Sequence, residues 1–329
     1  MEFHILIYFL AALFTGSAGA WIIINFGNKF DLLDKPNERS SHTLVTPKGG
    51  GIGIVASFAF FSLIFSIQNT FWISATFLAG LSFWGDKSEI SPVLRLCFQF
   101  IFALILLIGS FHSSGKNFLE YLLIIPFSVF IVGTANYYNF MDGINGIAGI
   151  TGAIAFGFLS YYASLLNIDK HFIIFLICIS CSCIGFLPFN MPDAKVFMGD
   201  VGSILLGFIF ASIVVLFSRT LLDFICLVSF LFPFYTDELT TLAVRIKDKD
   251  KLTRPHRKHL YQLMVNELNI QHWKISVGYG LLQLFIGISI LILRPLGIFV
   301  VLSVLILYFT GFMCISYLVR KRVIDIENH

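Results

Sequence analysis

The sequence predicts an all-α polytopic membrane protein, and three observations support this prediction. Of the 329 residues, 57% are hydrophobic and only 12% are charged, about half the charged fraction of an ordinary soluble domain. Apolar runs long enough to cross roughly 30 Å of hydrocarbon recur along the whole chain. We therefore expect a single integral-membrane domain over residues 1–329. Its eleven expected transmembrane helices are 4–26, 50–66, 71–85, 93–111, 120–138, 146–164, 172–187, 202–218, 221–236, 275–293 and 296–318.

The distribution of Lys and Arg predicts how these spans are oriented, because cytoplasmic loops are rich in both residues. All but four of the 22 Lys and Arg residues fall on one side of the membrane. We therefore expect the N-terminus outside and the C-terminus in the cytoplasm. The net charge of +3 follows from this topology and does not indicate a nucleic-acid partner. The expected active face consists of the cytoplasmic loops 27–49, 86–95, 139–145, 188–201 and 237–274.

Two polar islands interrupt the apolar pattern, at residues 188–203 and 136–146. In the first island, Asp200 stands between Gly199 and Gly202 at the mouth of an apolar helix. An ionisable residue near a bilayer is costly, which makes it a candidate functional residue. The two islands together indicate a membrane-embedded enzyme that handles a metal ion and a phosphorylated substrate.

Carboxylates stand at the cytoplasmic ends of four expected spans: Asp86, Asp142, Asp200 and Asp237. The parity of the spans puts all four on one face. Converging carboxylates suit Mg²⁺, which prefers oxygen ligands and bridges substrate phosphates, and Mn²⁺ is a candidate substitute. The alternative is that each Asp caps a helix or lies at the interface. Residues 200–203 could themselves begin a helix whose backbone N–H groups point at an anion.

The polar residues around these carboxylates are candidate substrate ligands. Asn136, Asn139, Asp142 and Asn145 recur at intervals of three, which places them near one another on a helical face. Such groups could bind a base, a ribose or a sugar, and the alternative is polar contact between helices. We also assign Asn190 to substrate binding. Phe197 could stack on a nucleobase, although an aromatic residue at a membrane interface is usually an anchor.

The two longest cytoplasmic loops add basic candidates. A helix beginning at Pro255 would carry His256 and His259 beside Arg254, and a cluster of His and Arg suits a diphosphate. The alternative is an interfacial basic helix without a catalytic part. In the first loop, Lys48 precedes a glycine run at 49–51, where backbone could closely approach a ligand.

These motifs resemble the polyprenyl-phosphate N-acetylhexosamine-1-phosphate transferases of glycosyltransferase family 4, which include the phospho-MurNAc-pentapeptide translocase. The strongest pieces are VFMGDVGS at 196–203 and NFMDG at 139–143. Weaker support comes from TPKGGG at 46–51 and from Asp86 with Arg95. The resemblance implies transfer of a sugar-1-phosphate from a UDP-N-acetyl sugar to undecaprenyl phosphate, with Mg²⁺ and release of UMP. It also implies a multi-pass protein of the bacterial inner membrane with a cytoplasmic active site.

Residue by residue, the resemblance makes Asp200 a metal ligand and Asp86 the second member of a catalytic and metal-binding acidic pair. Asp142 matches the first acid of an Asp-Gly-x-Asp-Gly motif, and His259 the first histidine of a His-x-His-His motif. The chain departs from the family pattern at three places: Gly85 replaces the first Asp of the pair, Asn145 the second acid, and Tyr261-Gln262 the last two histidines.

The form His-x-x-His-Leu-Tyr-Gln resembles the branch that starts O-antigen or capsule repeat units. That branch implies a role in lipopolysaccharide or other surface-glycan assembly, with acceptance of N-acetyl-deoxyhexoses such as FucNAc or QuiNAc. The sequence does not identify the sugar, and it leaves a homodimer open.

Two other functions remain to be weighed. A transporter or lipid flippase would carry ionisable residues within its spans, and the expected spans carry essentially none. A CDP-alcohol phosphatidyltransferase would need Asp-Gly-x-x-Ala-Arg, whereas Asp142-Gly143 is followed by Ile144-Asn145-Gly146-Ile147. Assaying UMP release from UDP-sugars with polyprenyl phosphate separates these classes.

Overall fold

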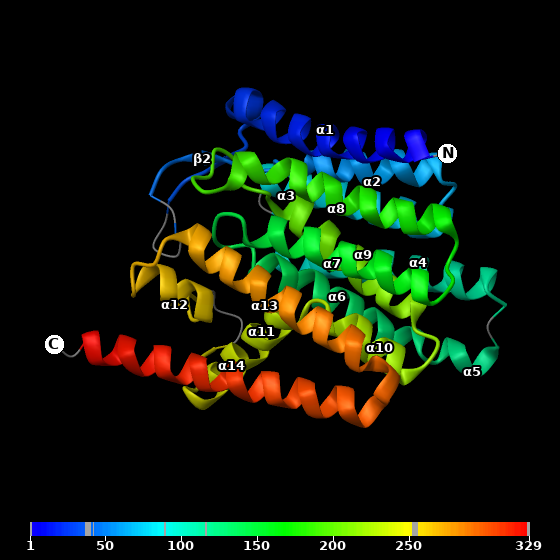
Figure 1. Cartoon of the computed structure of the whole chain (residues 1–329). Helices are drawn as coiled ribbons and strands as arrows, with labels where there is room; N and C mark the ends of the chain where they lie inside the picture. The colour runs from blue at the N-terminus through cyan, green and yellow to red at the C-terminus, as the bar shows by residue number, and fades with distance from the viewer. Residues whose placement is uncertain are drawn as a thin grey trace.

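The computed structural model of the chain is a helical bundle, and it describes residues 2–36, 41, 43–88, 90–115, 117–251 and 256–327. Most helices run along a common direction, and the two ends of the chain lie at opposite ends of the bundle (Figure 1). The helices are α1 (Glu2–Phe26), α2 (Ile52–Ile64), α3 (Asn69–Lys87), α4 (Pro92–Ser113), α5 (Phe118–Tyr121), α6 (Ile124–Phe140), α7 (Ile147–Leu165), α8 (Lys170–Asn190), α9 (Asp200–Phe217), α10 (Leu221–Ser229), α11 (Phe232–Lys247), α12 (Leu260–Asn266), α13 (His272–Leu293) and α14 (Ile298–Glu327).

Short elements complete the connections. The 3₁₀ helices η1 (Gly27–Phe30) and η2 (Arg294–Leu296) follow α1 and α13. A two-stranded antiparallel sheet joins β1 (Leu33–Asp34) to β2 (Thr46–Pro47), with Leu33 opposite Pro47 and Asp34 opposite Thr46. This pairing returns the first loop to the start of α2.

Among the described residues, eight helical stretches are long and apolar enough to cross a membrane. The predicted class, an all-α polytopic membrane protein, is therefore confirmed, while the count of eleven and the orientation stay predictions. Three expected spans are not among the eight. The span at 50–66 corresponds to α2, which has only 13 residues. The span at 71–85 lies within α3, and the span at 221–236 is divided between α10 and α11.

Helix α9 lies at the centre of the bundle. It is apolar on every side, and residues 201–215 are all buried. A helix without a polar face belongs in a core. Gly207 brings α9 close to α6, since a Cβ there would lie 2.7 Å from the Tyr138 Cβ. By contrast, α14 leaves most of its apolar surface exposed, as expected of a helix that faces lipid.

Helix α1 packs closely on α8 through glycines. A Cβ at Gly16 would lie 2.1 Å from the Ser182 carbonyl oxygen, and a Cβ at Gly185 would lie 2.1 Å from that of Leu13. Lipid is as apolar as a leucine face, so helices in a membrane gain most from such close backbone packing. The glycines therefore hold α1 onto the bundle.

The five loops that the sequence assigns to one face meet at one end of the bundle, near α12 and β2 (Figure 1). Three hydrogen bonds join them directly. The Phe197 N–H donates to the Pro47 carbonyl, the Asp200 N–H donates to the Asp86 carboxylate, and the Tyr261 hydroxyl donates to the Phe140 carbonyl. The loops therefore share one side, as the parity of the spans predicts.

Candidate functional site

Three of the four predicted carboxylates line one cavity of about 250 Å³, the acidic cavity. Asp86 comes from the end of α3, Asp142 follows α6, and Asp200 is the first residue of α9. The described lining consists of Asp34, Ser41, Lys48, Asp86, Asp142, Gly143, Ile144, Asn145, Phe197, Gly199, Asp200, Gln262 and His272. Three segments that are distant in sequence therefore bring their acids together.

Asp86 caps the N-terminus of α9. Its two carboxylate oxygens accept the backbone N–H groups of Asp200 at 3.1 Å and Val201 at 3.2 Å. Burial and the neighbouring Asp200 carboxylate raise the pKa of Asp86 to about 7, although these N–H groups and Lys48 act in the opposite direction. The sequence predicts an anion at this helix terminus, and in the structure the protein's own Asp86 occupies that position.

The Asp200 carboxylate forms an ion pair with Nη1 of Arg95 on α4. Asp142 lies beside the other two acids. Burial and then the charges of Asp200 and Asp86 raise the pKa of Asp142 well above its ordinary value. Like charges held close together disfavour full ionisation, so a bound cation would stabilise the ionised cluster.

These acids fit a hard divalent cation that shares its ligands with a substrate. No group of three or more His, Cys, Asp or Glu residues within the described ranges is arranged to hold a metal ion by itself. Mg²⁺ usually binds through one or two carboxylates and completes its coordination with water and substrate phosphates. Asp200 and Asp86 therefore fit a shared Mg²⁺ site and do not form a complete protein cage.

The glycine run at 49–51 pairs with the chain that enters α9. Gly50 N–H donates to the Phe197 carbonyl and Gly51 N–H to that of Met198, both at 2.9 Å. The prediction that this run approaches a ligand is wrong for these two amides, which bind protein backbone. A Cβ at Gly199 would lie only 2.7 Å from the Asp86 carboxylate. The pairing places Lys48 beside Phe197 at the edge of the acidic cavity.

Three predicted substrate ligands make hydrogen bonds within the protein. The Asn136 amide pairs with Gln99, donating to its Oε1 at 2.6 Å, and Asn139 accepts the Ser203 hydroxyl at 2.6 Å. Asn190 is 5% exposed, accepts the Gly146 N–H and donates to the Val196 carbonyl. Asn139 and Asn190 therefore connect segments of the protein, and they line none of the described cavities. Asn136 also borders an apolar groove, which is described below.

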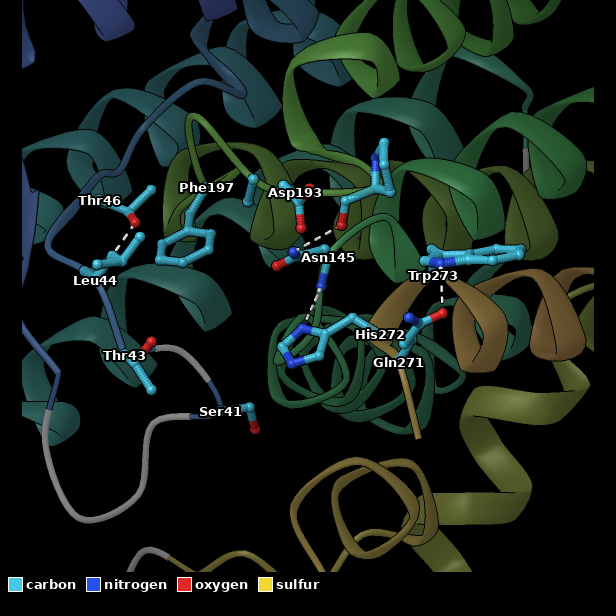
Figure 2. A pocket seen from close by; sticks show the side chains of 12 residues that line it. Ser41, Thr43, Leu44, Thr46, Asn145, Asp193, Phe197, Gln271, His272 and Trp273 are labelled. Carbon is cyan, nitrogen blue, oxygen red and sulfur yellow. Dashed lines mark hydrogen bonds between the residues drawn. The ribbon is translucent and has the colours of Figure 1, made fainter. Parts of the chain in front are cut away.

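Asn145 and His272 line both the acidic cavity and a larger one, in which Figure 2 shows them. The Asn145 N–H donates to Nδ1 of His272 at 3.4 Å, and the Asn145 side-chain amide donates to the Pro192 carbonyl at 3.0 Å. Ser276 donates to the Asn145 carbonyl at 2.7 Å. An Asp at position 145 would put a carboxylate oxygen against the Pro192 carbonyl. An amide at this position can therefore donate to the Pro192 carbonyl, whereas an ionised Asp could not.

The larger cavity, the rim cavity, has a volume of about 540 Å³. Figure 2 shows Phe197 on one side and Trp273 with Gln271 on the other. It shares Ser41, Asn145, Phe197 and His272 with the acidic cavity, so the two are adjacent. The remaining described lining is Thr43, Leu44, Thr46, Pro192, Asp193, Ala194, Gln271 and Trp273.

An apolar groove of about 670 Å³ lies between α4 and α6. Its wall is apolar along the helices and basic at the end near the acidic cavity. Arg95 lines this groove while its guanidinium contacts Asp200, so it links the two spaces. The described lining is Pro92, Arg95, Leu96, Phe100, Val129, Val132, Gly133, Asn136, Phe140, Arg245, His256, His259 and Gln262.

The histidines lie ahead of a helix and not on one. Helix α12 begins only at Leu260, with His259 at its N-cap position, so the prediction that His256 and His259 share a helical face is wrong. Asp237 is fully buried and accepts the Leu260 N–H at 2.9 Å and the Tyr279 hydroxyl at 2.7 Å. Asp237 therefore holds this segment in place and does not join the acidic cavity. Arg254 lies outside the described residues.

Two carboxylates flank His259. Its Nδ1 lies 3.6 Å from Asp237 and its Nε2 lies 3.7 Å from Glu238. Burial disfavours the imidazolium, but these carboxylates outweigh burial and raise the pKa of His259. Burial and the His259 charge lower the pKa of His256 to about 4. The pKa values of the two histidines therefore shift in opposite directions.

Comparison with known proteins finds relatives that match most of the chain. The family model described as glycosyl transferase family 4 matches residues 69–218, a range that includes Asp86, Arg95, Asp142 and Asp200. An undecaprenyl-phosphate alpha-N-acetylglucosaminyl 1-phosphate transferase from Thermotoga maritima is 29% identical over 273 residues, 80% of this chain and 84% of that protein. The chain is thus similar to the undecaprenyl-phosphate sugar-1-phosphate transferases of glycosyl transferase family 4.

Two further relatives show how the resemblance is distributed within family 4. A probable undecaprenyl-phosphate N-acetylglucosaminyl 1-phosphate transferase from Bacillus subtilis is 25% identical over 322 residues, 92% of this chain and 88% of that protein. A phospho-N-acetylmuramoyl-pentapeptide-transferase from Staphylococcus saprophyticus is 33% identical over 195 residues, 54% of this chain and 57% of that protein.

The sequence does not single out three residues of this site: Arg95, which it shows only within a motif, Glu238 and His272. His272 is separated from Asn145 by 127 residues, and a lone His at the start of an apolar helix gives no local signal. The charged neighbours of His259 become visible only when α11 and the segment before α12 are placed together.

Proposed function

We propose that this protein transfers an N-acetylhexosamine-1-phosphate from a UDP-sugar to undecaprenyl phosphate and releases UMP. The observation that carries the proposal is the junction of the acidic cavity with the apolar groove. Asp200 lines the cavity, and its partner Arg95 lines the groove. A polar donor and a long apolar acceptor can therefore meet at one point. Two relatives whose names include this acceptor match this chain over more than four-fifths of their own length.

The acidic cavity suits the diphosphate. Asp200 and Asp86 would hold Mg²⁺ jointly with phosphate oxygens, as hard oxygen donors do. When bound, Mg²⁺ neutralises the charge that develops on a transferring phosphoryl group. Lys48 lines the same cavity and supplies a further positive charge. Asp142 lines the same cavity and would add a third acidic group beside the cation.

The rim cavity suits the uridine part of the donor. Phe197 lines both this cavity and the acidic one, so its ring can stack on a base while the diphosphate lies beside the acids. Asn145 donates its amide N–H to Pro192, which turns the amide oxygen toward the other side as an acceptor. These two side chains offer apolar contact and hydrogen bonding to the base.

The apolar groove suits the polyprenyl chain, and its basic end suits the acceptor phosphate. An oxygen of that phosphate forms a bond to the β-phosphorus of the donor. The bond between the β-phosphorus and its bridging oxygen breaks, and the electron pair leaves with UMP. A phosphate monoester is already ionised at pH 7, so the reaction does not require a base at Gly85. Arg95 and the His259 imidazolium hold the two phosphates together against their repulsion.

We further propose that the reaction starts assembly of an O-antigen or another surface glycan at the cytoplasmic face of a bacterial inner membrane. The His-x-x-His-Leu-Tyr-Gln sequence at 256–262 supports this branch. The peptidoglycan-type relative matches only about half of each chain, whereas the N-acetylglucosaminyl relatives match most of both. The excess of Lys and Arg in the loops around the site supports a cytoplasmic location.

The test is a direct assay of UMP release. Purified protein is given undecaprenyl phosphate, Mg²⁺ and a panel of UDP-N-acetyl sugars, and mass spectrometry detects the lipid-linked product. We expect equal amounts of UMP and lipid diphosphate sugar from at least one donor, with loss of both in EDTA. Movement of lipid across vesicles without UMP release would instead establish the transporter or flippase alternative.

A further inference from the structure

The segment of residues 256–262, which we call the histidine segment, contains little regular structure of its own. It enters the seven-residue helix α12 at Leu260. Isolated helices this short are unstable in water because nucleation is unfavourable. The position of His259 at the end of the apolar groove therefore depends on what the rest of the protein contacts along this segment.

Arg320, near the end of α14, makes one of these contacts. Its Nη2 donates to the Lys258 carbonyl at 2.7 Å and to the Thr241 hydroxyl at 3.2 Å, while its Nε donates to Ser316 at 3.2 Å. The guanidinium is therefore oriented by its own helix and binds the residue immediately before His259. Hydrogen bonds from a charged donor are stronger than those between neutral groups.

The Thr241 hydroxyl continues this contact to Asp237. It donates to the Asp237 Oδ1 at 3.1 Å, and Asp237 in turn accepts the Leu260 N–H at 2.9 Å. Lys258 is thus held from one side by α14 and Leu260 from the other by α11, with His259 between them. A second attachment, from the Tyr261 hydroxyl to the Phe140 carbonyl, joins the segment to the loop that carries Asp142.

We propose that α14 positions the histidine segment through Arg320, which makes Arg320 a positioning residue for phosphoryl transfer. This inference rests on the proposed function for its catalytic part. Arg320 itself lines none of the described cavities. It acts through the Lys258 carbonyl by holding the His259 side chain at the groove, so that loss of Arg320 displaces His259 without removing a substrate contact.

The experiment compares Arg320→Met with Arg322→Met, a matched loss of one Arg from an exposed position on the same helix. Hydrogen exchange measures how fast the backbone amides of residues 256–266 exchange, and steady-state kinetics measures kcat/KM for transfer. In Arg320→Met we expect these amides to exchange about tenfold faster and kcat/KM to be about tenfold lower. Arg322→Met should match the wild type in both. Arg320→Lys should restore part of the loss, because an ammonium can still reach one acceptor.

Thr241→Val provides a second variant if Arg320→Met fails to fold, because it removes the hydroxyl between Arg320 and Asp237 and keeps the shape. Faster exchange with reduced kcat/KM supports the inference. Exchange in Arg320→Met and Thr241→Val equal to that in Arg322→Met would overturn it, and so would faster exchange with unchanged kcat/KM. Absence of UMP release by the wild type would refute the proposed function instead, while the exchange experiment would still show whether Arg320 holds the segment.

Discussion

Asp86 and Asp200, separated by 114 residues in the sequence, are joined by a hydrogen bond from the Asp200 N–H to the Asp86 carboxylate. Two acids that the sequence assigns to one metal ion are therefore also the cap and the first residue of one helix. Asp86 accepts backbone N–H groups with both oxygens, whereas the Asp200 side chain points to Arg95. Their substitutions should have different consequences.

For Asp200→Asn we expect transfer to be abolished with expression and membrane insertion intact. The side chain does not cap its own helix, so the lost charge affects the cation and Arg95 more than the fold. The measurement is Mg²⁺-dependent UMP release beside the yield of folded protein. Retention of more than a few per cent of the activity would exclude Asp200 from the metal site.

For Asp86→Asn we expect losses in both activity and stability. An amide offers one oxygen where the carboxylate offers two, so one of the Asp200 and Val201 N–H groups loses its acceptor, at a cost of about 1–3 kcal/mol. The thermal midpoint should fall below that of Asp200→Asn, as measured by a melting assay in detergent. Equal midpoints would show that the cap contributes little to stability.

For Asn145→Asp, which restores the family's acid, we expect lower activity. The new carboxylate oxygen would lie against the Pro192 carbonyl, where the amide now donates at 3.0 Å. The contact is exposed, so water screens the repulsion, and we expect a cost of about 0.2–1 kcal/mol, or up to roughly a fivefold loss in kcat/KM. The control is Asn145→Ala, which removes the bond without adding charge. Activity of the Asp variant above that of the Ala variant would contradict the geometric explanation.

For His259 we expect a role as a cation. Because Asp237 and Glu238 raise its pKa despite burial, the imidazolium is present below that raised pKa and is lost as the pH rises through it. The kcat/KM should therefore decrease as the pH rises through this pKa. His259→Gln should lower kcat/KM about ten- to hundredfold at neutral pH and remove that alkaline decrease. His256→Gln should keep the alkaline decrease of kcat/KM, since the pKa of His256 is about 4.

Arg254→Ala, measured against UDP-sugar concentration, completes this series. We expect roughly a ten- to hundredfold lower kcat/KM if Arg254 binds the diphosphate. Near wild-type kinetics in both Arg254→Ala and His259→Ala at fixed lipid would instead make this loop an interfacial anchor.

For Gly185→Ala we expect a marked loss of stability. Its Cβ would lie 2.1 Å from the Leu13 carbonyl oxygen, and the overlap can be relieved only by separating α1 from α8, at a cost of about 1–3 kcal/mol or more. Gly278→Ala is the matched control, because a Cβ there meets nothing within 4 Å. That variant should be as stable as the wild type or more so, since Ala favours a helix over Gly. Similar melting of both variants would contradict the packing argument.

The sequence by itself determined the class of protein and its resemblance to a known family, and both follow from local patterns. Long apolar runs specify transmembrane helices whatever their neighbours, and the motifs around Asp142 and Asp200 are contiguous in the chain. The common side of the five loops also follows from the sequence, because each crossing of the membrane reverses the direction of the chain. Asp86, Asp142 and Asp200 could therefore be predicted to meet.

Only the tertiary structure decided what each polar group contacts. The amides of Gly50 and Gly51 bind backbone, Asp237 holds the histidine segment, and Arg95 and His272 belong to the site. These assignments depend on hydrogen bonds between segments that are distant in sequence. The same Asp can bind a metal ion, cap a helix or pair with an Arg. The choice depends on which groups lie within about 3 Å of it, a distance set by how the helices pack.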